Sequence, residues 1–140
     1  MNEDTITVKT TVDAPIKTVW ECWIHPKHIT RWAFGSDDWE APEAENDLRE
    51  GGTFKTVMAA KDGSASFDFT GTYTLVIDQK AIEYELDDGR QVRTIFKEMP
   101  DGVRITQTFD PENENSIDMQ RTGWQTILDN FKQHTEAHLD

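Results

Sequence analysis

Cysteine is almost missing from the chain, which has only Cys22 among its 140 residues. One thiol cannot form an intramolecular disulfide, and we do not expect a thiolate zinc site. Cys22 lies in a run whose apolar residues recur at helical spacing, so we interpret it as a small buried hydrophobic residue.

Basic residues are also scarce relative to acidic ones. The chain has 14 Lys and Arg residues against 27 Asp and Glu residues, which gives a formal net charge of −13 at pH 7. A surface of that sign repels the phosphates of nucleic acids and of anionic lipids. We therefore expect no nucleic-acid partner, and we interpret the acidic excess as a solubilising surface.

Long hydrophobic runs are missing as well, because no uninterrupted apolar segment approaches the ~20 residues that a membrane-spanning helix needs. The N-terminal segment MNEDTITVKT lacks the basic and then apolar pattern of a signal peptide. We expect a cytoplasmic protein without a membrane span. With 36% hydrophobic residues and this length, residues 1–140 are expected to form one globular domain.

Motifs of metal, phosphate and nucleophile chemistry are absent. The sequence has no phosphate-binding glycine loop, dinucleotide fingerprint, nucleophile elbow or pair of zinc histidines around a glutamate. His25 and His28 flank a proline, while His134 and His138 have the spacing of a helical metal pair without an evident third ligand. We interpret all four as surface histidines. The acid-rich segment 37–50 lacks the ligand order of a calcium loop, so no metal and no cofactor are expected.

Much of the chain alternates between apolar and polar residues, which is the pattern of half-buried strands. Turn sequences at 61–64, 88–89 and 100–102 separate the alternating segments. The segment 36–50 has no periodicity and is predicted to be a loop. The predicted strands are 5–12, 53–58, 67–75, 82–86, 91–97 and 103–109.

Other segments have the helical period. The apolar side chains of residues 16–23 fall on one stripe, and residues 27–32 can add one more short turn. Ser116 can cap a long C-terminal helix whose apolar stripe continues to about His134. One strand, two short helices, an antiparallel meander and a long helix predict an α+β domain, in which a curved sheet wraps around that helix.

Several short motifs follow one another along the chain. They are Val12-Asp13-Ala14-Pro15, Val19-Trp20, His25-Pro26, Arg31-Trp32, Leu48-Arg49-Glu50-Gly51-Gly52-Thr53-Phe54, Gly71-Thr72-Tyr73, and Gly123-Trp124 with Leu128. In this order and spacing they resemble the START-like (SRPBCC) superfamily. Within it, the chain is similar to small bacterial proteins resembling the C-terminal domain of the activator of the ninety-kilodalton heat-shock-chaperone ATPase.

The resemblance implies a helix-grip fold, in which an antiparallel sheet grips the long C-terminal helix and leaves a cavity between them. Relatives use that cavity for lipids, sterols, polyketides or other apolar molecules, and a few cyclise or dehydrate what they hold. The resemblance also implies a chaperone as a protein partner. We expect no second domain with which to engage a chaperone, so this partner is a secondary expectation.

In a helix-grip fold the inward side chains form both the core and the cavity wall. The segment after the first helices borders the cavity mouth in relatives, which implies that Trp32, Phe34 and Trp39 lie there. The inward aromatic residues expected to line the walls are Phe54, Phe69, Tyr73, Tyr84 and Trp124. The same spacing also fits an ordinary aromatic core.

Polar residues on inward faces are more informative, because burying an amide or hydroxyl is unfavourable unless it has a partner. The alternation and the helical spacing place five of them inward: Thr10, Thr56, Thr94, Gln107 and Gln120. Their partner is either a ligand's polar end or a neighbouring protein group or water. We expect Gln107 and Gln120 to project together into the cavity. Gly123, inside the last helix, indicates that space or a close approach is needed beside it.

The leading hypothesis is a cytoplasmic protein that holds a small hydrophobic or amphipathic ligand in this cavity. One alternative is an enzyme of the cyclase or dehydratase type, for which Tyr73, Tyr84 and Asp37 are the available proton donors. The acids that can be placed on strands point outward, which disfavours that alternative. The other alternative is a protein-interaction module that stimulates an ATPase through an exposed apolar surface.

Overall fold

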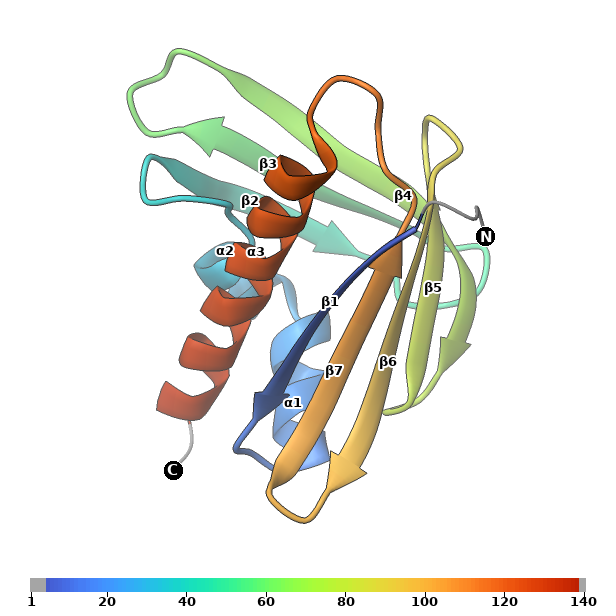
Figure 1. Ribbon diagram of the computed structural model, residues 1–140. Coiled ribbons are helices and arrows are strands. Elements are labelled where there is room, and N and C mark those ends of the chain that lie inside the picture. The colour runs from blue at the N-terminus through green and yellow to red at the C-terminus, as the bar shows by residue number, and fades with distance from the viewer. Residues whose placement is uncertain (1–4, 139–140) are drawn as a thin grey trace.

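The computed structural model describes residues 5–138, and within this range seven strands form one antiparallel sheet (Figure 1). The strands are β1 (Ile6–Val12), β2 (Trp39–Asn46), β3 (Thr53–Ala60), β4 (Ser66–Ile77), β5 (Ala81–Leu86), β6 (Gln91–Met99) and β7 (Gly102–Phe109). The helices are α1 (Ile16–Ile24) and α2 (Pro26–Trp32), which follow β1, and the long α3 (Ile117–Ala137). The predicted α+β class and the two short helices after the first strand are confirmed.

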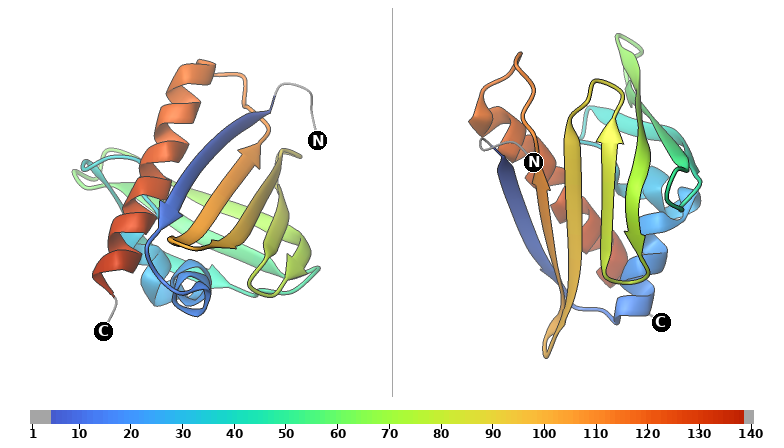
Figure 2. Two further views of the ribbon diagram at one scale, coloured as in Figure 1. Left: turned by 60° about the horizontal axis from the view of Figure 1, so that its bottom comes forward. Right: turned by 90° about the vertical axis from the view of Figure 1, so that its right-hand side faces the viewer.

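The sheet is curled around the helices. Its strand order is β1-β7-β6-β5-β4-β3-β2, so the first strand pairs with the last and the remaining strands form a meander. The helices lie on the same face of the sheet, and α3 runs alongside β1 (Figure 2). This is the helix-grip arrangement that the resemblance implies. No helix in residues 5–138 combines the length and the apolar character needed to cross a membrane.

Both ends of α3 are held by specific hydrogen bonds. Ser116 caps the helix as predicted, because its hydroxyl accepts a hydrogen bond of 3.1 Å from a backbone N–H of the first turn. Near the other end, the Lys132 ammonium donates to the Thr11 carbonyl at 2.7 Å, and the Glu136 carboxylate accepts from the Asp13 backbone N–H at 2.8 Å. These bonds attach the C-terminal half of α3 to the end of β1.

The core lies between the sheet and the helices. Phe131 of α3 is fully buried, and its ring lies 4.8 Å from that of Trp23 and 5.0 Å from that of Trp32, measured between centroids. Val19 and Trp20 of α1 are also buried, as the helical stripe predicts. The two short helices and α3 are therefore joined by one aromatic cluster, formed by Trp23, Trp32 and Phe131.

The segment predicted to be a loop contains the edge strand β2. Its pairing with β3 shifts between Glu40 and Glu43, a bulge that accommodates Pro42. A proline has no N–H for the ladder and is tolerated at an edge or a bulge, but the extra residue breaks the period of two. The loop prediction for 36–50 is therefore wrong for residues 39–46, because the bulge hides the alternation.

Candidate functional site

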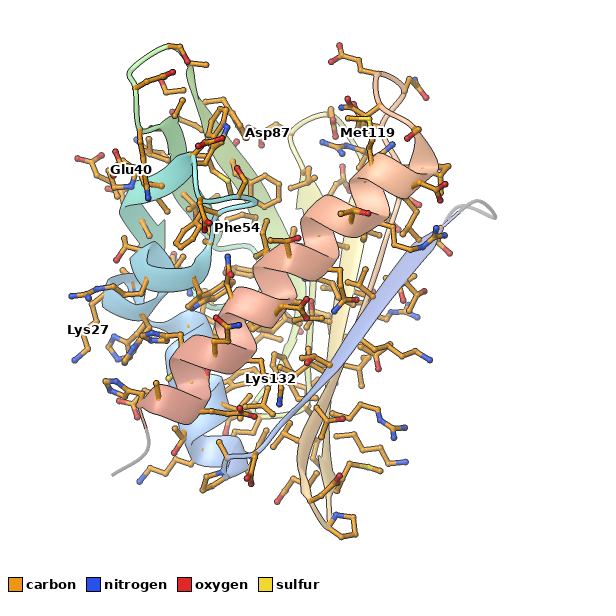
Figure 3. All side chains as sticks on the ribbon, turned by 60° about the vertical axis from the view of Figure 1, so that its left-hand side comes forward. Lys27, Glu40, Phe54, Asp87, Met119 and Lys132 are labelled. Carbon is orange, nitrogen blue, oxygen red and sulfur yellow. The ribbon has the colours of Figure 1, made fainter. Side chains whose placement is uncertain are left out.

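A cavity of about 300 Å³ lies between the sheet and α3. It receives side chains from α1, α2, α3 and the strands β2, β3, β4, β5 and β7, so the curl of the sheet creates it. Figure 3 shows Phe54, one of its lining residues, between the strands and α3. The volume is at the lower end of the range of small-molecule pockets.

All five aromatic residues predicted for the wall line this cavity, namely Phe54, Phe69, Tyr73, Tyr84 and Trp124. Of the three residues predicted for its mouth, Trp32 is also a lining residue. Several rings touch one another, such as Phe54 and Tyr84 at 4.7 Å and Phe69 and Trp124 at 6.1 Å between centroids. The wall is thus a connected aromatic surface.

Trp124 links α3 to the sheet. Its ring stacks on Phe109 of β7 with centroids 3.8 Å apart and planes inclined by 13°. The side chain is half-buried, because it also lines the cavity. A Cβ added at the neighbouring Gly123 would meet nothing within 4 Å, so this glycine borders open space and does not mark a close backbone approach.

Four residues predicted for the site do not line the cavity. Phe34 is half-buried after α2, where its carbonyl accepts a hydrogen bond from Asn130 at 2.9 Å. Trp39, the first residue of β2, packs on Phe67 of β4, and the two ring centroids are 5.8 Å apart. Thr94 is fully buried behind the wall, and Gln120 faces the connection between β7 and α3.

The two glutamines predicted to act together have separate environments. Gln107 lines the cavity and its amide donates to the Thr94 hydroxyl at 3.0 Å. The Gln120 amide instead accepts from the Glu112 backbone N–H at 2.9 Å and donates to the carbonyls of Glu112 and Asn115. The two glutamines therefore do not project together into the cavity, because the side-chain amide of Gln120 is hydrogen-bonded to the backbone of the segment before α3.

Two further polar residues of the sequence analysis are on the inner face. Thr56 of β3 is buried and lines the cavity. Thr10 of β1 is half-buried opposite Ile105 and is not part of the wall. Asp37, one of the available proton donors, is exposed and also outside the wall.

The two tyrosines of the wall differ in their hydrogen bonds. The Tyr73 hydroxyl donates to the side-chain oxygen of Asn46, whose amide in turn donates to the Ile24 carbonyl at 2.7 Å. The Tyr84 hydroxyl makes no hydrogen bond to any of residues 5–138. Burial raises the pKa of both side chains, so both hydroxyls are protonated at neutral pH. Tyr84 therefore presents an unpaired donor at the cavity wall.

A large part of the wall consists of residues that were not predicted from the sequence. Glu45 and Asn46 lie on β2, which was predicted to be a loop, and Arg90 follows a turn. Arg90 is paired with Asp88 at 2.8 Å. The other lining residues could have been found from the apolar stripes of the helices and from the alternation in β3 to β5. The missed lining residues are Trp23, Ile29, Ala33, Glu45, Asn46, Met58, Phe67, Ile82, Arg90, Ile127 and Leu128.

The prediction of surface histidines is wrong for His28. This side chain is buried, and its Nδ1 lies 2.9 Å from Nε2 of His134 on α3. The packing of α2 against α3 brings the two histidine pairs together, and local spacing cannot show such a contact.

The chain matches the model of a protein family described as Activator of Hsp90 ATPase homolog 1-like protein over residues 13–136. An AHSA1-like protein from Aeromonas hydrophila, solved in solution, is 41% identical over 97% of both chains, with a TM-score of 0.90. A protein from Cytophaga hutchinsonii is 47% identical over 97% of this chain and 95% of that chain, with a TM-score of 0.79. A protein from Nitrosomonas europaea shares the fold, with 18% identity over 98% of this chain and 97% of that chain and a TM-score of 0.82. No curated protein matches the chain.

Proposed function

Since the chain belongs to the family of Activator of Hsp90 ATPase homolog 1-like proteins, a family of ligand-binding domains, we propose that it binds a small amphipathic molecule in its cavity. The observation that carries the proposal is the protonated, unpaired hydroxyl of Tyr84 within a wall of aromatic rings. The apolar part of the ligand packs on the rings, and its polar end accepts a hydrogen bond from Tyr84. We propose that this binding occurs in the cytoplasm and needs no cofactor.

The charge near Tyr84 supports an oxygen acceptor as the polar end of the ligand. Arg90 lines the same cavity, and its positive charge acts on the pKa of Tyr84 in the direction opposite to burial. A carbonyl or carboxylate oxygen at this position gains from both the hydroxyl dipole and the guanidinium charge. We therefore propose a ligand with an apolar body and one terminal carbonyl or carboxylate group.

The alternatives have less support. An enzyme of the cyclase or dehydratase type needs an acid or base near neutral pKa, whereas burial makes both tyrosines of the wall weaker acids. Glu45 lines the cavity, but it is exposed to solvent. A surface-acting module would use exposed apolar residues away from the cavity. Among the described residues, Ile77, Ile95, Ile117 and Met119 are of this kind, but they are divided among β4, β6 and the first turn of α3, whereas Phe67, which is 52% exposed, lines the cavity.

The Tyr84→Phe variant is expected to weaken binding without weakening the fold. As a probe we choose anilinonaphthalene sulfonate, which has an aromatic body and one anionic end. The wild-type protein should bind one equivalent, and the variant should bind about 5–10-fold more weakly, as expected for one lost hydrogen bond. Its free energy of unfolding should stay within about 0.5 kcal/mol of wild type, since no protein group loses a partner. Fluorescence titration and denaturant unfolding measure the two quantities.

The matched control is Tyr73→Phe, which removes a hydroxyl that has a protein partner. This variant should lose about 1 kcal/mol of stability through the lost bond to Asn46. An equal probe affinity in Tyr84→Phe and wild type would contradict the role of the Tyr84 hydroxyl.

Filling the cavity tests the location of binding. Ile127 of α3 lines the cavity, so Ile127→Trp should abolish probe binding, whereas Gln133→Trp on the exposed side of α3 should leave it unchanged. Native mass spectrometry of protein purified from its own host should show a bound small molecule that Ile127→Trp lacks. Undiminished probe binding by a folded Ile127→Trp protein would overturn the proposed function.

A further inference from the structure

A second cluster of chemically active side chains lies outside the cavity, where the three helices meet. Cys22 of α1, His28 of α2 and His134 of α3 each contribute one possible donor atom, and these three atoms lie within 4.8 Å of one another. His28 Nδ1 and His134 Nε2 are 2.9 Å apart. The ring of His138 is adjacent, with its centroid 4.6 Å from that of His28.

The cluster is held by the packing of the helices. Figure 3 shows α2, which carries Lys27, beside the C-terminal turns of α3. Cys22 and His28 are buried and His134 is half-buried, so the thiol lies inside and the cluster opens on the side of the exposed His138. The Trp32 indole donates to the Cys22 carbonyl at 3.0 Å, which fixes the corner between α1 and α2.

One buried polar group beside the cluster is without a satisfactory partner. Thr135 is fully buried, and its hydroxyl makes no hydrogen bond of ordinary geometry to any described residue. It lies beside the Cys22 thiol, where it lowers the pKa of that thiol while burial, the larger effect, raises it. A thiolate at Cys22 would accept a hydrogen bond from this hydroxyl and so satisfy it.

The two imidazoles face each other across one hydrogen bond. Burial is the main cause that lowers the pKa of both His28 and His134, and the neighbouring histidines lower it further. The hydrogen bond between their facing nitrogens requires that one of the two nitrogens carries no proton and acts as the acceptor. Neutral imidazole is the form that coordinates divalent transition metals.

The dimensions of the cluster fit a tetrahedral ion. With bonds of about 2.0–2.1 Å to nitrogen and about 2.3 Å to sulfur, donor atoms around Zn²⁺ lie roughly 3.3–3.6 Å apart. The separations here extend from 2.9 Å to at most 4.8 Å, so side-chain shifts on the order of 1 Å reach that geometry. One thiolate with two imidazoles suits Zn²⁺ and its neighbours in the first transition row and disfavours Mg²⁺ and Ca²⁺.

We propose that Cys22, His28 and His134 form a binding site for a divalent transition-metal ion of the Zn²⁺ type. The fourth coordination position faces the solvent side, where His138 lies. Binding releases the thiol proton of Cys22 to solvent and moves the proton between His28 Nδ1 and His134 Nε2 to the other nitrogen of the ring that carries it. The ion then joins α1, α2 and α3. The prediction from sequence that the chain has no metal site is replaced by this proposal, which is independent of the ligand cavity.

Titration with Co²⁺ tests the site, because a cobalt ion bound to a thiolate gives a charge-transfer band in the near ultraviolet. The full chain without a histidine tag should bind one equivalent and show this band together with the visible bands of tetrahedral cobalt. Cys22→Ser should lose the charge-transfer band. His134→Gln should bind cobalt at least about 10–100-fold more weakly, the loss that removing even a supporting partner of a ligand causes.

His25→Gln is the matched control, because His25 is exposed and its ring centroid lies 6.4 Å from that of His28. This variant should bind cobalt like wild type. Circular dichroism establishes that each variant is folded, and a thermal shift with Zn²⁺ that wild type shows and His134→Gln lacks gives a second measurement. A wild-type protein without the charge-transfer band, a band that persists in Cys22→Ser, or equal losses in His25→Gln and His134→Gln would overturn the proposal.

Discussion

Replacing Phe131 by alanine is expected to lower the free energy of unfolding by about 3–5 kcal/mol. The ring is fully buried and contacts the rings of Trp23 and Trp32 edge to face. Its loss removes apolar burial from the place where α3 crosses the short helices. It also leaves a void that three helices fixed by other contacts cannot close. Denaturant unfolding followed by tryptophan fluorescence measures the change.

The control for this prediction is Gln133→Ala on the same helix. Gln133 is exposed, so this change should alter the free energy of unfolding by no more than about 0.5 kcal/mol. A loss below about 1 kcal/mol in Phe131→Ala would contradict the packing of α3 on α1 and α2.

The second large effect is expected from Gly102→Ala at the start of β7. Gly102 has a φ of 142°, and a Cβ built on it would lie 2.1 Å from the carbonyl oxygen of Val12. Alanine there combines backbone strain of about 1–3 kcal/mol with overpacking of about 1–3 kcal/mol, because the contact is with the backbone of β1 and cannot be relieved by a side-chain rotation. We expect a loss of about 2–6 kcal/mol in the free energy of unfolding, measured by denaturant titration.

The same substitution at Gly123 is expected to change the free energy of unfolding in the opposite direction. Gly123 lies inside α3, and an added Cβ would meet nothing within 4 Å. Alanine there should raise the free energy of unfolding by about 0.5–1 kcal/mol, since glycine is the poorer helix former. Parallel destabilisation of both variants would show that the space beside Gly123 is needed by the fold.

Sequence patterns alone determined the elements whose period is unbroken. Alternation located β4 and β5, the helical stripe placed Val19 and Trp20 of α1 inward, and Ser116 marked the start of α3. Each of these signals is local, because the spacing of the apolar residues within a strand or helix indicates which of its faces is buried. The strand β2 was missed because the bulge around Pro42 interrupts that local signal.

The cavity wall was predictable only in part, for a similar reason. Inward aromatic residues such as Phe54 and Tyr73 followed from the alternation, and they line the cavity. Periodicity indicates that a residue faces inward, but it does not indicate whether that residue meets other side chains or an open cavity. Phe34 and Trp39 were expected at the mouth from the resemblance, and their position depends on how the chain after α2 meets the sheet.

The sequence by itself thus determined the composition, the helix-grip order of elements and the inward faces. Only the tertiary structure decided which groups the polar side chains contact. Gln107 and Gln120 look equivalent in the sequence, yet one faces the cavity and the other binds the backbone before α3. His28 and His134 are separated by 106 positions and meet because α2 packs on α3. A side chain's hydrogen-bond partner is set by the distances between elements, and those distances arise only when the elements pack together.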